Sequence, residues 1–118
     1  MITTGIDIED ISRFENKTLE KDKKFLDRIY TKDELDYCFK FSNPASRLAA
    51  RYCAKEAVVK ALSNLYSKTI SYNKIEVVKK TNGSVGVNIL IDELKKYNYS
   101  LSISHDKTKA VAFVVVSD

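Results

Sequence analysis

One stretch of the chain gathers the charged residues that are best suited to chemistry. It runs from Arg47 to Leu62 and reads Arg-Leu-Ala-Ala-Arg-Tyr-Cys-Ala-Lys-Glu-Ala-Val-Val-Lys-Ala-Leu. Strong helix formers fill it and neither Gly nor Pro interrupts it, which predicts a long helix. Asn43 is expected to be its N-cap and Pro44 its first helical residue, where the missing N–H of proline costs nothing.

At about 100° per residue, this helix sorts its side chains by chemistry. Five small residues share one face, which another backbone can approach closely: Ala50, Cys53, Ala54, Ala57 and Ala61. Glu56 and Lys60 lie together roughly opposite that face. Arg47, Arg51 and Lys55 follow one another at i, i+4 spacing along a third line. A lone carboxylate with four cations indicates a negatively charged ligand beside the helix.

A simpler interpretation accounts for the same charges. Glu56 and Lys60 form an i, i+4 pair in the favourable order, which is worth a few tenths of a kcal/mol. The three remaining cations can form a solvated face whose aliphatic stems are buried. Spacing alone leaves both interpretations open.

A second carboxylate stands on a predicted strand at the N-terminus, from Ile2 to Ile11. The isoleucines at positions 2, 6 and 8 share parity and are expected to face the core. Gly5, Asp7 and Glu9 then point the other way. Asp is depleted in strands, so Asp7 is a candidate functional residue as well as a candidate solvent-facing one.

The only histidine, His105, ends a predicted Leu-Ser-Ile-Ser-His strand and is followed by Asp106 and Lys107. A lone histidine at a strand end is more often structural than catalytic. Here the neighbouring hydroxyl and N–H groups could also meet a phosphate. A single histidine excludes a multi-histidine metal site within the chain.

The remaining elements must position these candidates. Apolar residues at helical spacing predict a helix over residues 25–30, and Thr31-Lys-Asp-Glu34 is a capping box that opens a second short helix. Alternation then predicts strands over 74–79 and 85–91, joined by a turn at Asn82-Gly83. A short amphipathic helix over 92–97 and strands over 101–105 and 111–116 complete the chain. The last strand is a continuous apolar run, which favours burial on both faces. The order β-α-α-α-β-β-α-β-β predicts an α+β fold, with helices packed on a mostly antiparallel sheet.

Composition narrows the function classes. A chain of 118 residues predicts one domain, residues 1–118, with a small core. A net charge of +4 suits a polyanionic partner without choosing among phosphates, nucleic acid and acidic protein. No apolar run is long enough to span a membrane, and the strand-like start predicts no signal peptide. Cys38 and Cys53 lie in helical patterns and are expected to be buried free thiols of a cytoplasmic protein.

With these residues placed, the sequence resembles the holo-[acyl-carrier-protein] synthases, the short bacterial type of 4′-phosphopantetheinyl transferase. The resemblance covers nearly the whole chain and rests on five motifs in the family's order. These are Gly5-Ile-Asp7-Ile-Glu-Asp-Ile-Ser-Arg13; Arg28-Ile-Tyr-Thr31 with Glu34-Leu; Arg51-Tyr-Cys-Ala-Lys55-Glu56-Ala-Val-Val-Lys60-Ala; Ile75-Glu76-Val77 with Asn82-Gly83; and Leu101-Ser-Ile-Ser104-His105. In the third motif Tyr52 takes the place of the family's Phe or Trp.

The resemblance implies an activity, a fold and an assembly. Family members transfer 4′-phosphopantetheine from coenzyme A to a serine of apo acyl carrier protein and release 3′,5′-ADP, as a step of fatty acid biosynthesis. They have a mostly antiparallel sheet packed against a long helix and are trimers, with coenzyme A bound between neighbouring subunits. The expected partners are therefore acyl carrier protein, coenzyme A and further copies of the chain, and neither nucleic acid nor a membrane.

The same resemblance assigns site residues. Asp7 and Glu56 match the two carboxylates that hold Mg²⁺, and magnesium prefers such oxygen ligands. Glu56, or a water on the metal, is the expected base for the serine proton, and Lys60 would steady the pyrophosphate or the leaving charge. The positions that match coenzyme A contacts are Arg51, Lys60, Asn82, Gly83, Ser104 and His105. The positions that match the surface for the acidic carrier protein are Arg13, Lys24 and Arg28, together with Lys21 and Lys23.

Three departures from the family pattern bear on this assignment. Ser63-Asn64-Leu65 replaces a Gly-x-Gly, and Ser84-Val85 replaces a cation followed by proline, so coenzyme A is expected to bind more weakly or with its adenine held differently. Glu9 matches a carboxylate of the larger two-domain transferases and is a candidate third metal ligand. Two other interpretations stay open: a basic nucleic-acid-binding module, and a family member that binds a carrier protein without transferring anything.

Overall fold

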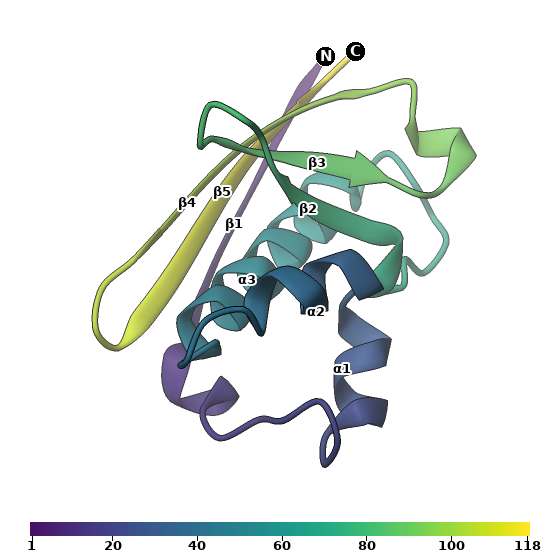
Figure 1. Cartoon of the computed structure of the whole chain (residues 1–118). Helices are drawn as coiled ribbons and strands as arrows, with labels where there is room; N and C mark the ends of the chain where they lie inside the picture. The colour runs from purple at the N-terminus through teal and green to yellow at the C-terminus, as the bar shows by residue number, and fades with distance from the viewer.

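The computed structural model describes all 118 residues, and its elements follow the predicted order with one exception (Figure 1). The elements are β1 (Ile2–Asp10), η1 (Ile11–Phe14), α1 (Lys23–Ile29), α2 (Lys32–Cys38), α3 (Ala45–Leu62), η2 (Tyr72–Lys74), β2 (Ile75–Lys79), β3 (Val85–Ile89), η3 (Asp92–Leu94), β4 (Asn98–His105) and β5 (Lys109–Ser117), where η denotes a 3₁₀ turn. The α+β class with antiparallel pairing is confirmed.

The exception is the helix predicted over residues 92–97. Only the single 3₁₀ turn η3 forms there, because the backbone closes with i→i+3 bonds: the N–H of Lys95 donates to Asp92 O and that of Tyr97 to Leu94 O. The chain then enters β4 at Asn98, which leaves no room for a second helical turn.

Two antiparallel sheets carry the strands. In the larger sheet β5 lies between β1 and β4, and in the smaller sheet β2 pairs with β3. Asp7 is opposite Ala112 on β5, while His105 is opposite Ala110 on the other side of β5. These two candidate residues therefore stand on the two outer strands of one sheet.

Helix α3 packs across one face of the larger sheet, with α2 and the β2–β3 hairpin on its other side (Figure 1). The small-residue face predicted for this helix is confirmed, because Ala50, Cys53, Ala54, Ala57 and Ala61 are all buried. The contact is closest at Gly5, where an added Cβ would lie 1.8 Å from Ala57 O. A glycine in β1 and alanines in α3 thus let strand and helix approach backbone to backbone.

This close contact reverses the predicted orientation of β1. Ile2, Ile6 and Ile8 are 72%, 58% and 61% exposed in the single chain, whereas Gly5 is buried. The prediction that the isoleucines face the core is wrong, because only the side of β1 that carries Gly5 allows α3 to come near. Side chains alternate along a strand, so Asp7 lies on the same side as Gly5 and faces α3.

Strand β5 is likewise covered on one side only. Ala110, Ala112, Val114 and Val116 are buried against α3, but Phe113 is 44% exposed on the other side. Burial on both faces, predicted from the apolar run, is therefore wrong for one copy of the chain. The three isoleucines and Phe113 form one apolar sheet face.

The local signals that end and start the helices were mostly correct. Thr31 caps α2 through its hydroxyl and Glu34 completes the capping box. Helix α3 starts one residue later than predicted, with Pro44 as N-cap, and Asn43 Oδ1 accepts from the N–H of Ala45 at 3.2 Å. Gly83 takes a φ of +88° in the hairpin turn.

Both cysteines are buried and free, as predicted. No helix has the length and apolar content needed to cross a membrane.

Candidate functional site

Asp7 and Lys60 meet where β1 crosses α3. The Lys60 ammonium donates to Asp7 Oδ1 at 3.3 Å and to the carbonyl of Ile6 at 2.9 Å. The second oxygen, Asp7 Oδ2, is buried and has no hydrogen-bond partner. Asp7 is therefore no solvent-facing strand residue, and Lys60 pairs with it rather than with Glu56.

Glu56 lies one turn before Lys60 on α3 and is held through one oxygen. Its Oε1 accepts from the hydroxyl of Tyr52 at 3.1 Å and from the hydroxyl of Tyr72. No side chain or backbone group donates to Oε2. Residues four apart on a helix are neighbours, so Lys60 brings Asp7 into the vicinity of Glu56.

These oxygens fit a hard divalent cation. A buried carboxylate oxygen without a partner and a carboxylate with one free oxygen are the donor type that Mg²⁺ takes, and Mg²⁺ keeps several waters, so two carboxylates are enough. No group of three or more His, Cys, Asp or Glu side chains is arranged to hold a metal ion. We call Asp7, Glu56 and Lys60 the carboxylate half-site.

Glu9, the candidate third metal ligand, forms an ion pair with Arg13. Its Oε1 accepts from Arg13 Nη1 at 3.0 Å. Burial raises the pKa of Glu9, and the nearby Asp7 carboxylate raises it further. The structure thus places Glu9 beside Asp7 but in an ion pair with Arg13.

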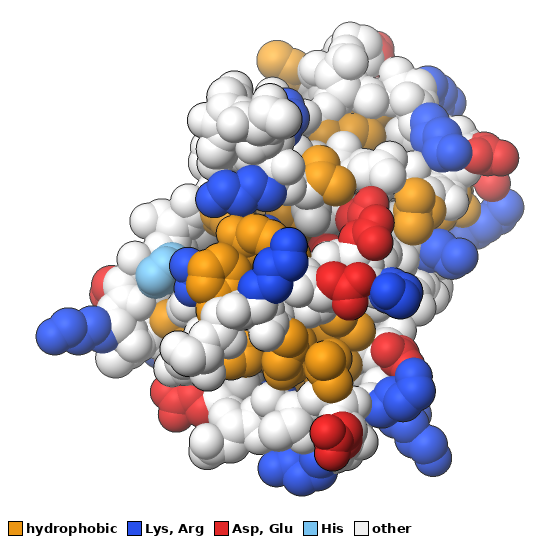
Figure 2. Space-filling model, in the orientation of Figure 1, with side chains coloured by type: hydrophobic (Ala, Val, Ile, Leu, Met, Phe, Trp, Pro, Cys, Tyr) orange, Lys and Arg blue, Asp and Glu red, His pale blue; other side chains and the backbone are white.

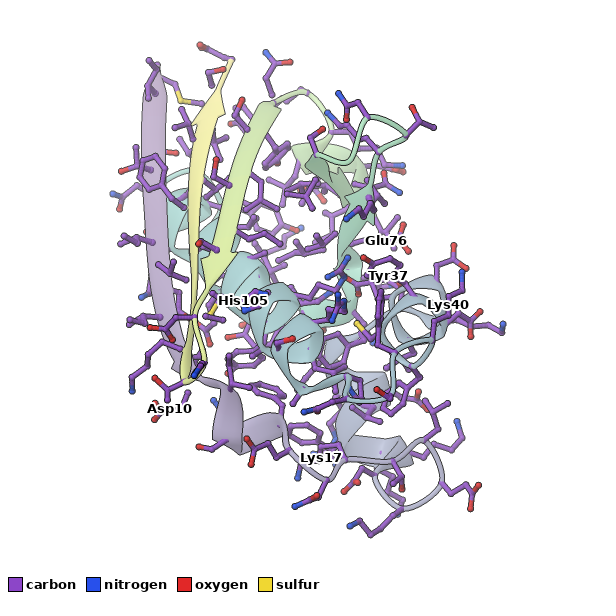
Figure 3. The ribbon with its side chains drawn as sticks, turned by 60° about the vertical axis from the view of Figure 1, so that its left-hand side comes forward. Asp10, Lys17, Tyr37, Lys40, Glu76 and His105 are labelled. Carbon is purple, nitrogen blue, oxygen red and sulfur yellow. The ribbon has the colours of Figure 1, made fainter.

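A second candidate region is a pocket of about 150 Å³ between α2, α3, the hairpin and β4. It is lined by Tyr37, Ser46, Arg47, Ala50, Arg51, Lys79, Val85, Ile103 and His105. Figure 2 shows the single histidine on this face of the molecule, with basic and apolar side chains beside it. In Figure 3, His105 and Tyr37 flank the region in front of α3. We call this region the cationic pocket.

The charge in this pocket is positive and tightly held. The Arg51 guanidinium lies 4.4 Å from the centroid of the Tyr37 ring, and its Nε is buried without a partner. Arg47 lies 3.4 Å from the centroid of the Phe41 ring. Burial by itself raises the pKa of Tyr37, but Arg47, Lys79 and Arg51 outweigh it and lower that pKa. A pocket that stabilises a phenolate favours an anion such as a phosphate.

The simpler interpretation of the cations on α3 is wrong for two of the three. Arg51 is 3% exposed and Lys55 is fully buried, so they do not form a solvated face. Lys55 Nζ lies 2.7 Å from Glu34 Oε1 and also donates to the carbonyls of Tyr72 and Ile75. Burial lowers the pKa of Lys55, and the Glu34 carboxylate opposes that shift. Lys55 has a structural role.

Other predicted coenzyme contacts are not gathered in this pocket. Ser104 lies on the opposite face of β4 from His105 and lines another cavity, of about 310 Å³, with Ile8 and Lys109; His105 also borders this second cavity. Asn82 and Gly83 are exposed in the β2–β3 loop. The residues that flank this loop, Lys79 and Val85, line the cationic pocket instead.

The two regions lie far apart around α3. Arg51 and Lys60 are nine residues apart, which is about half a turn around the helix axis. Asp7 and His105 stand on the two outer strands of the larger sheet. One chain therefore carries a carboxylate half-site and a cationic pocket that do not face each other.

The predicted basic surface lies on α1 and η1. Lys24 and Arg28 are exposed on α1 and have no ion-pair partner. Arg13 is paired with Glu9 and lies 4.8 Å from the centroid of the Tyr52 ring. The rings of Phe14 and Phe25, 6.4 Å apart, link η1 to α1.

Sequence patterns did not single out Tyr72, Tyr37, Lys79 or Glu34 as site residues. Tyr72 stands in Ser-Tyr-Asn-Lys, which carries no periodicity, and Tyr37 was placed only as part of a short helix. Glu34 was placed in the capping box and in a family motif, without a role at the site. Lys79 ends β2 and has the same parity as the buried Ile75 and Val77. This parity was the one sequence signal that could have placed its side chain toward the pocket.

Three comparisons with known proteins bear on this site. Residues 3–115 match the family model described as the 4′-phosphopantetheinyl transferase superfamily. The chain is 41% identical over 121 residues to the holo-[acyl-carrier-protein] synthase of Carboxydothermus hydrogenoformans, covering 98% of both chains. It is 39% identical over 113 residues to the protein of the same name from Thermodesulfovibrio yellowstonii, covering 96% of both.

Solved structures of similar fold bear the same name. The Helicobacter pylori holo-[acyl-carrier-protein] synthase in complex with coenzyme A superposes with a TM-score of 0.80 at 34% identity, covering 99% of this chain and 100% of that one. The Bacillus anthracis enzyme in complex with CoA (3′,5′-ADP) gives a TM-score of 0.78 at 31% identity, with coverage of 97% and 94%.

Proposed function

The chain belongs to the 4′-phosphopantetheinyl transferase superfamily, and from this we infer that it is a holo-[acyl-carrier-protein] synthase. It transfers the 4′-phosphopantetheine group from coenzyme A to a serine of apo acyl carrier protein and releases 3′,5′-ADP, with fatty acid biosynthesis as the expected role. Residues 1–118 act as one transferase domain. The observation that carries the assignment is the presence of two regions, the carboxylate half-site suited to a divalent cation and the cationic pocket suited to a phosphate, on a chain with full-length relatives of this name.

Asp7 and Glu56 are the proposed Mg²⁺ ligands. They offer the unpartnered oxygens Asp7 Oδ2 and Glu56 Oε2. When bound, the ion would supply charge neutralisation for the pyrophosphate of coenzyme A. Because Lys60 already donates to Asp7 Oδ1, it stands where it can also donate to a pyrophosphate oxygen.

The reacting groups are then oriented by the chain itself. The serine hydroxyl of the carrier attacks the β-phosphorus, the P–O bond to the leaving 3′,5′-ADP breaks, and either the Glu56 carboxylate or a neighbouring water accepts the serine proton. Most of the rate enhancement in such a transfer comes from positioning and charge stabilisation. The Lys60 ammonium provides positive charge, and the two carboxylates would hold the cation that supplies more.

The cationic pocket is the proposed binding site for the phosphates at the adenosine end of coenzyme A. Arg51 and His105 line it together with Arg47 and Lys79. Asn82, Gly83 and Ser104 keep their proposed roles only if coenzyme A extends beyond this pocket, over the hairpin loop or onto the other face of β4.

The separation of the half-sites supports a composite site between copies of the chain. The pyrophosphate and the adenosine are adjacent parts of coenzyme A, whereas the two regions lie about half a turn apart around the same helix. The apolar sheet face, with Ile2, Ile6, Ile8 and Phe113 exposed, offers a surface for association. We propose a homotrimer in which His105 of one copy completes the site of the next. Light scattering at micromolar concentration tests this, and full activity at the mass of one chain would contradict it.

Acyl carrier protein is proposed to dock on the basic surface formed by Arg13, Lys24 and Arg28. Lys24 and Arg28 are exposed without ion-pair partners, which leaves their charge available to an acidic protein.

One assay tests the function as a whole. The protein is mixed with coenzyme A, Mg²⁺ and apo carrier protein, and the carrier is examined by mass spectrometry for the added phosphopantetheine. Asp7→Ala and Glu56→Ala are expected to abolish transfer and to stay folded by circular dichroism. Asp36→Ala, in an exposed pair with Lys32 on α2, is the matched control. Transfer at the wild-type rate by Asp7→Ala would end the metal assignment, and a carrier that binds the wild type but stays unmodified would refute the transferase.

A further inference from the structure

We propose that the hydroxyl of Tyr72, on a turn clamped by the buried Lys55, fixes the orientation of the Glu56 carboxylate. Tyr72 and Lys55 are then positioning residues of the transferase. This inference rests on the proposed function of Glu56 and goes beyond it, because it assigns a role to two residues outside both half-sites.

The first step is the contact itself. Tyr52, four residues before Glu56 on α3, and Tyr72, from the distant turn η2, both donate to the same oxygen, Oε1. Two donors that converge on one oxygen from different elements oppose rotation of the carboxylate, and hydrogen bonds to a charged acceptor are the stronger kind. Oε2 is consequently held in one direction, away from both phenols.

The second step is the packing that holds the phenols. The rings of Tyr52 and Tyr72 lie edge to face, with centroids 5.6 Å apart and planes at 81°. Tyr52 also packs against Phe14 and Arg13. The Tyr72 hydroxyl is thus held against the Glu56 carboxylate by ring packing as well as by its own hydrogen bond.

The third step is the clamp on η2. The side chains of Lys55 and Glu34 are fully buried in an ion pair. From there Lys55 Nζ donates to the carbonyl of Tyr72 at 3.0 Å and to that of Ile75, at the two ends of the turn. Glu34 Oε2 accepts from the N–H of Val77 at 2.8 Å, which extends the clamp into β2.

These contacts close a ring through two adjacent residues of α3. Lys55 points into the core and holds the backbone of Tyr72, and the Tyr72 hydroxyl returns to Glu56. Lys55 therefore fixes the turn η2, and Tyr72 on that turn orients the carboxylate of Glu56. Removing a group that hydrogen-bonds to a metal ligand and so orients it usually lowers metal affinity or activity by about 10- to 100-fold.

The test removes the Tyr72 hydroxyl and keeps its ring. Tyr72→Phe is compared with Tyr66→Phe, a matched control, because Tyr66 lines the same cavity at the end of α3 but donates no hydrogen bond to Glu56. Binding of Mn²⁺, used as a spectroscopic stand-in for Mg²⁺, is titrated by electron paramagnetic resonance with coenzyme A present. Transfer rates give kcat and the KM for the carrier protein.

Tyr72→Phe is expected to weaken Mn²⁺ binding about tenfold and to lower kcat by a similar factor. The KM for the carrier should stay within about twofold of wild type, since the ring packing and the basic surface are retained. Tyr66→Phe should match wild type in every readout. Tyr52→Phe combined with Tyr72→Phe should weaken Mn²⁺ binding more than either change alone.

Wild-type Mn²⁺ affinity and wild-type kcat in Tyr72→Phe would overturn the proposal and leave Tyr72 with a packing role only. An equal loss in Tyr66→Phe would also overturn it, since the effect would then belong to the cavity. The failure of the proposed function looks different, because the wild-type protein would then transfer nothing to the carrier. In that case the ¹³C signal of the Glu56 carboxyl still reports the contact, which should shift in Tyr72→Phe and stay in place in Tyr66→Phe.

Discussion

Replacing Gly5 with alanine places a methyl group where β1 and α3 touch. The added Cβ would lie 1.8 Å from Ala57 O, 2.8 Å from Ala57 C and 3.0 Å from Ala61 N. All three are backbone atoms of a helix, so no side chain can rotate away to make room. Strand and helix must separate instead.

The size of the effect follows from these distances. To move from 1.8 Å to the 3.0 Å that real Cβ contacts respect, the elements must part by about 1.2 Å. A gap of about 0.5–1 Å already forfeits a quarter to a half of the dispersion attraction of the atoms on either side. Overpacking usually costs about 1–3 kcal/mol, and the rigid neighbours place this site at the upper end, near 3 kcal/mol. The midpoint of thermal unfolding should fall by about 10 °C.

Activity should fall with stability, because Asp7 is two residues from Gly5 on the same face of β1. A displacement of about 1 Å relative to Lys60 can cost about 100-fold in rate. The assays are urea unfolding, thermal unfolding and transfer kinetics, all at one fixed chain concentration. Gly86→Ala is the matched control: it is also a strand glycine, but its added Cβ meets the flexible end of the Lys80 side chain at 2.8 Å.

Gly86→Ala is expected to stay within about 1 kcal/mol of wild type. If Gly5→Ala unfolds at the wild-type urea concentration, the backbone contact between β1 and α3 is not the constraint described here. If it is destabilised but transfers at the wild-type rate, the position of Asp7 does not depend on that contact.

Three further predictions concern the buried pair, the cationic pocket and the carrier surface. Lys55→Met should lower the free energy of unfolding by about 3–5 kcal/mol, because it leaves the Glu34 carboxylate buried and unpaired. Urea unfolding measures this loss, and a loss below about 1 kcal/mol would contradict a stabilising role for the ion pair. Because neighbouring cations lower the pKa of Tyr37, its phenolate forms at a lower pH than that of a free tyrosine and then repels a phosphate. The affinity for coenzyme A, measured by calorimetry, should therefore fall as the pH rises toward 10 in wild type and fall less in Tyr37→Phe. Equal pH dependence in the two proteins would refute the contact. Charge reversal at Arg28 or Arg13 should raise the KM for the carrier protein and leave that for coenzyme A unchanged, as steady-state kinetics can show, and the opposite pattern would mean that the docking surface lies elsewhere.

Several features of this protein followed from the sequence because they depend on local chemistry. The capping box at Thr31, the small-residue face of α3 and the Asn82-Gly83 turn are set by residues close together in the chain. The family motifs carried the activity, and the matched family model and full-length relatives confirm that part. The roles given to individual site residues stay predictions.

Orientation was beyond what local patterns could decide. Alternation along β1 gave two possible faces, and hydrophobicity chose the isoleucine face as the buried one. Helix α3 packs on the other face because Gly5 lets its backbone approach to contact distance, and this choice turns Asp7 toward Lys60. The isoleucines then remain on the exposed face, where only another molecule could cover them.

The fate of each charge on α3 was also decided by tertiary structure. Arg47, Arg51 and Lys55 share one spacing, yet Lys55 is buried against Glu34, Arg51 lies against Tyr37 and Arg47 lies over Phe41. Their partners come from α2 and from the segment that follows it, and spacing along α3 contains no information about what packs there. The sequence by itself determined the helix and the charges on it. Only the packing of α2, η2 and β1 around that helix decided which charges are structural and which are free to bind, because desolvation and ion pairing depend on neighbours that are distant in the chain.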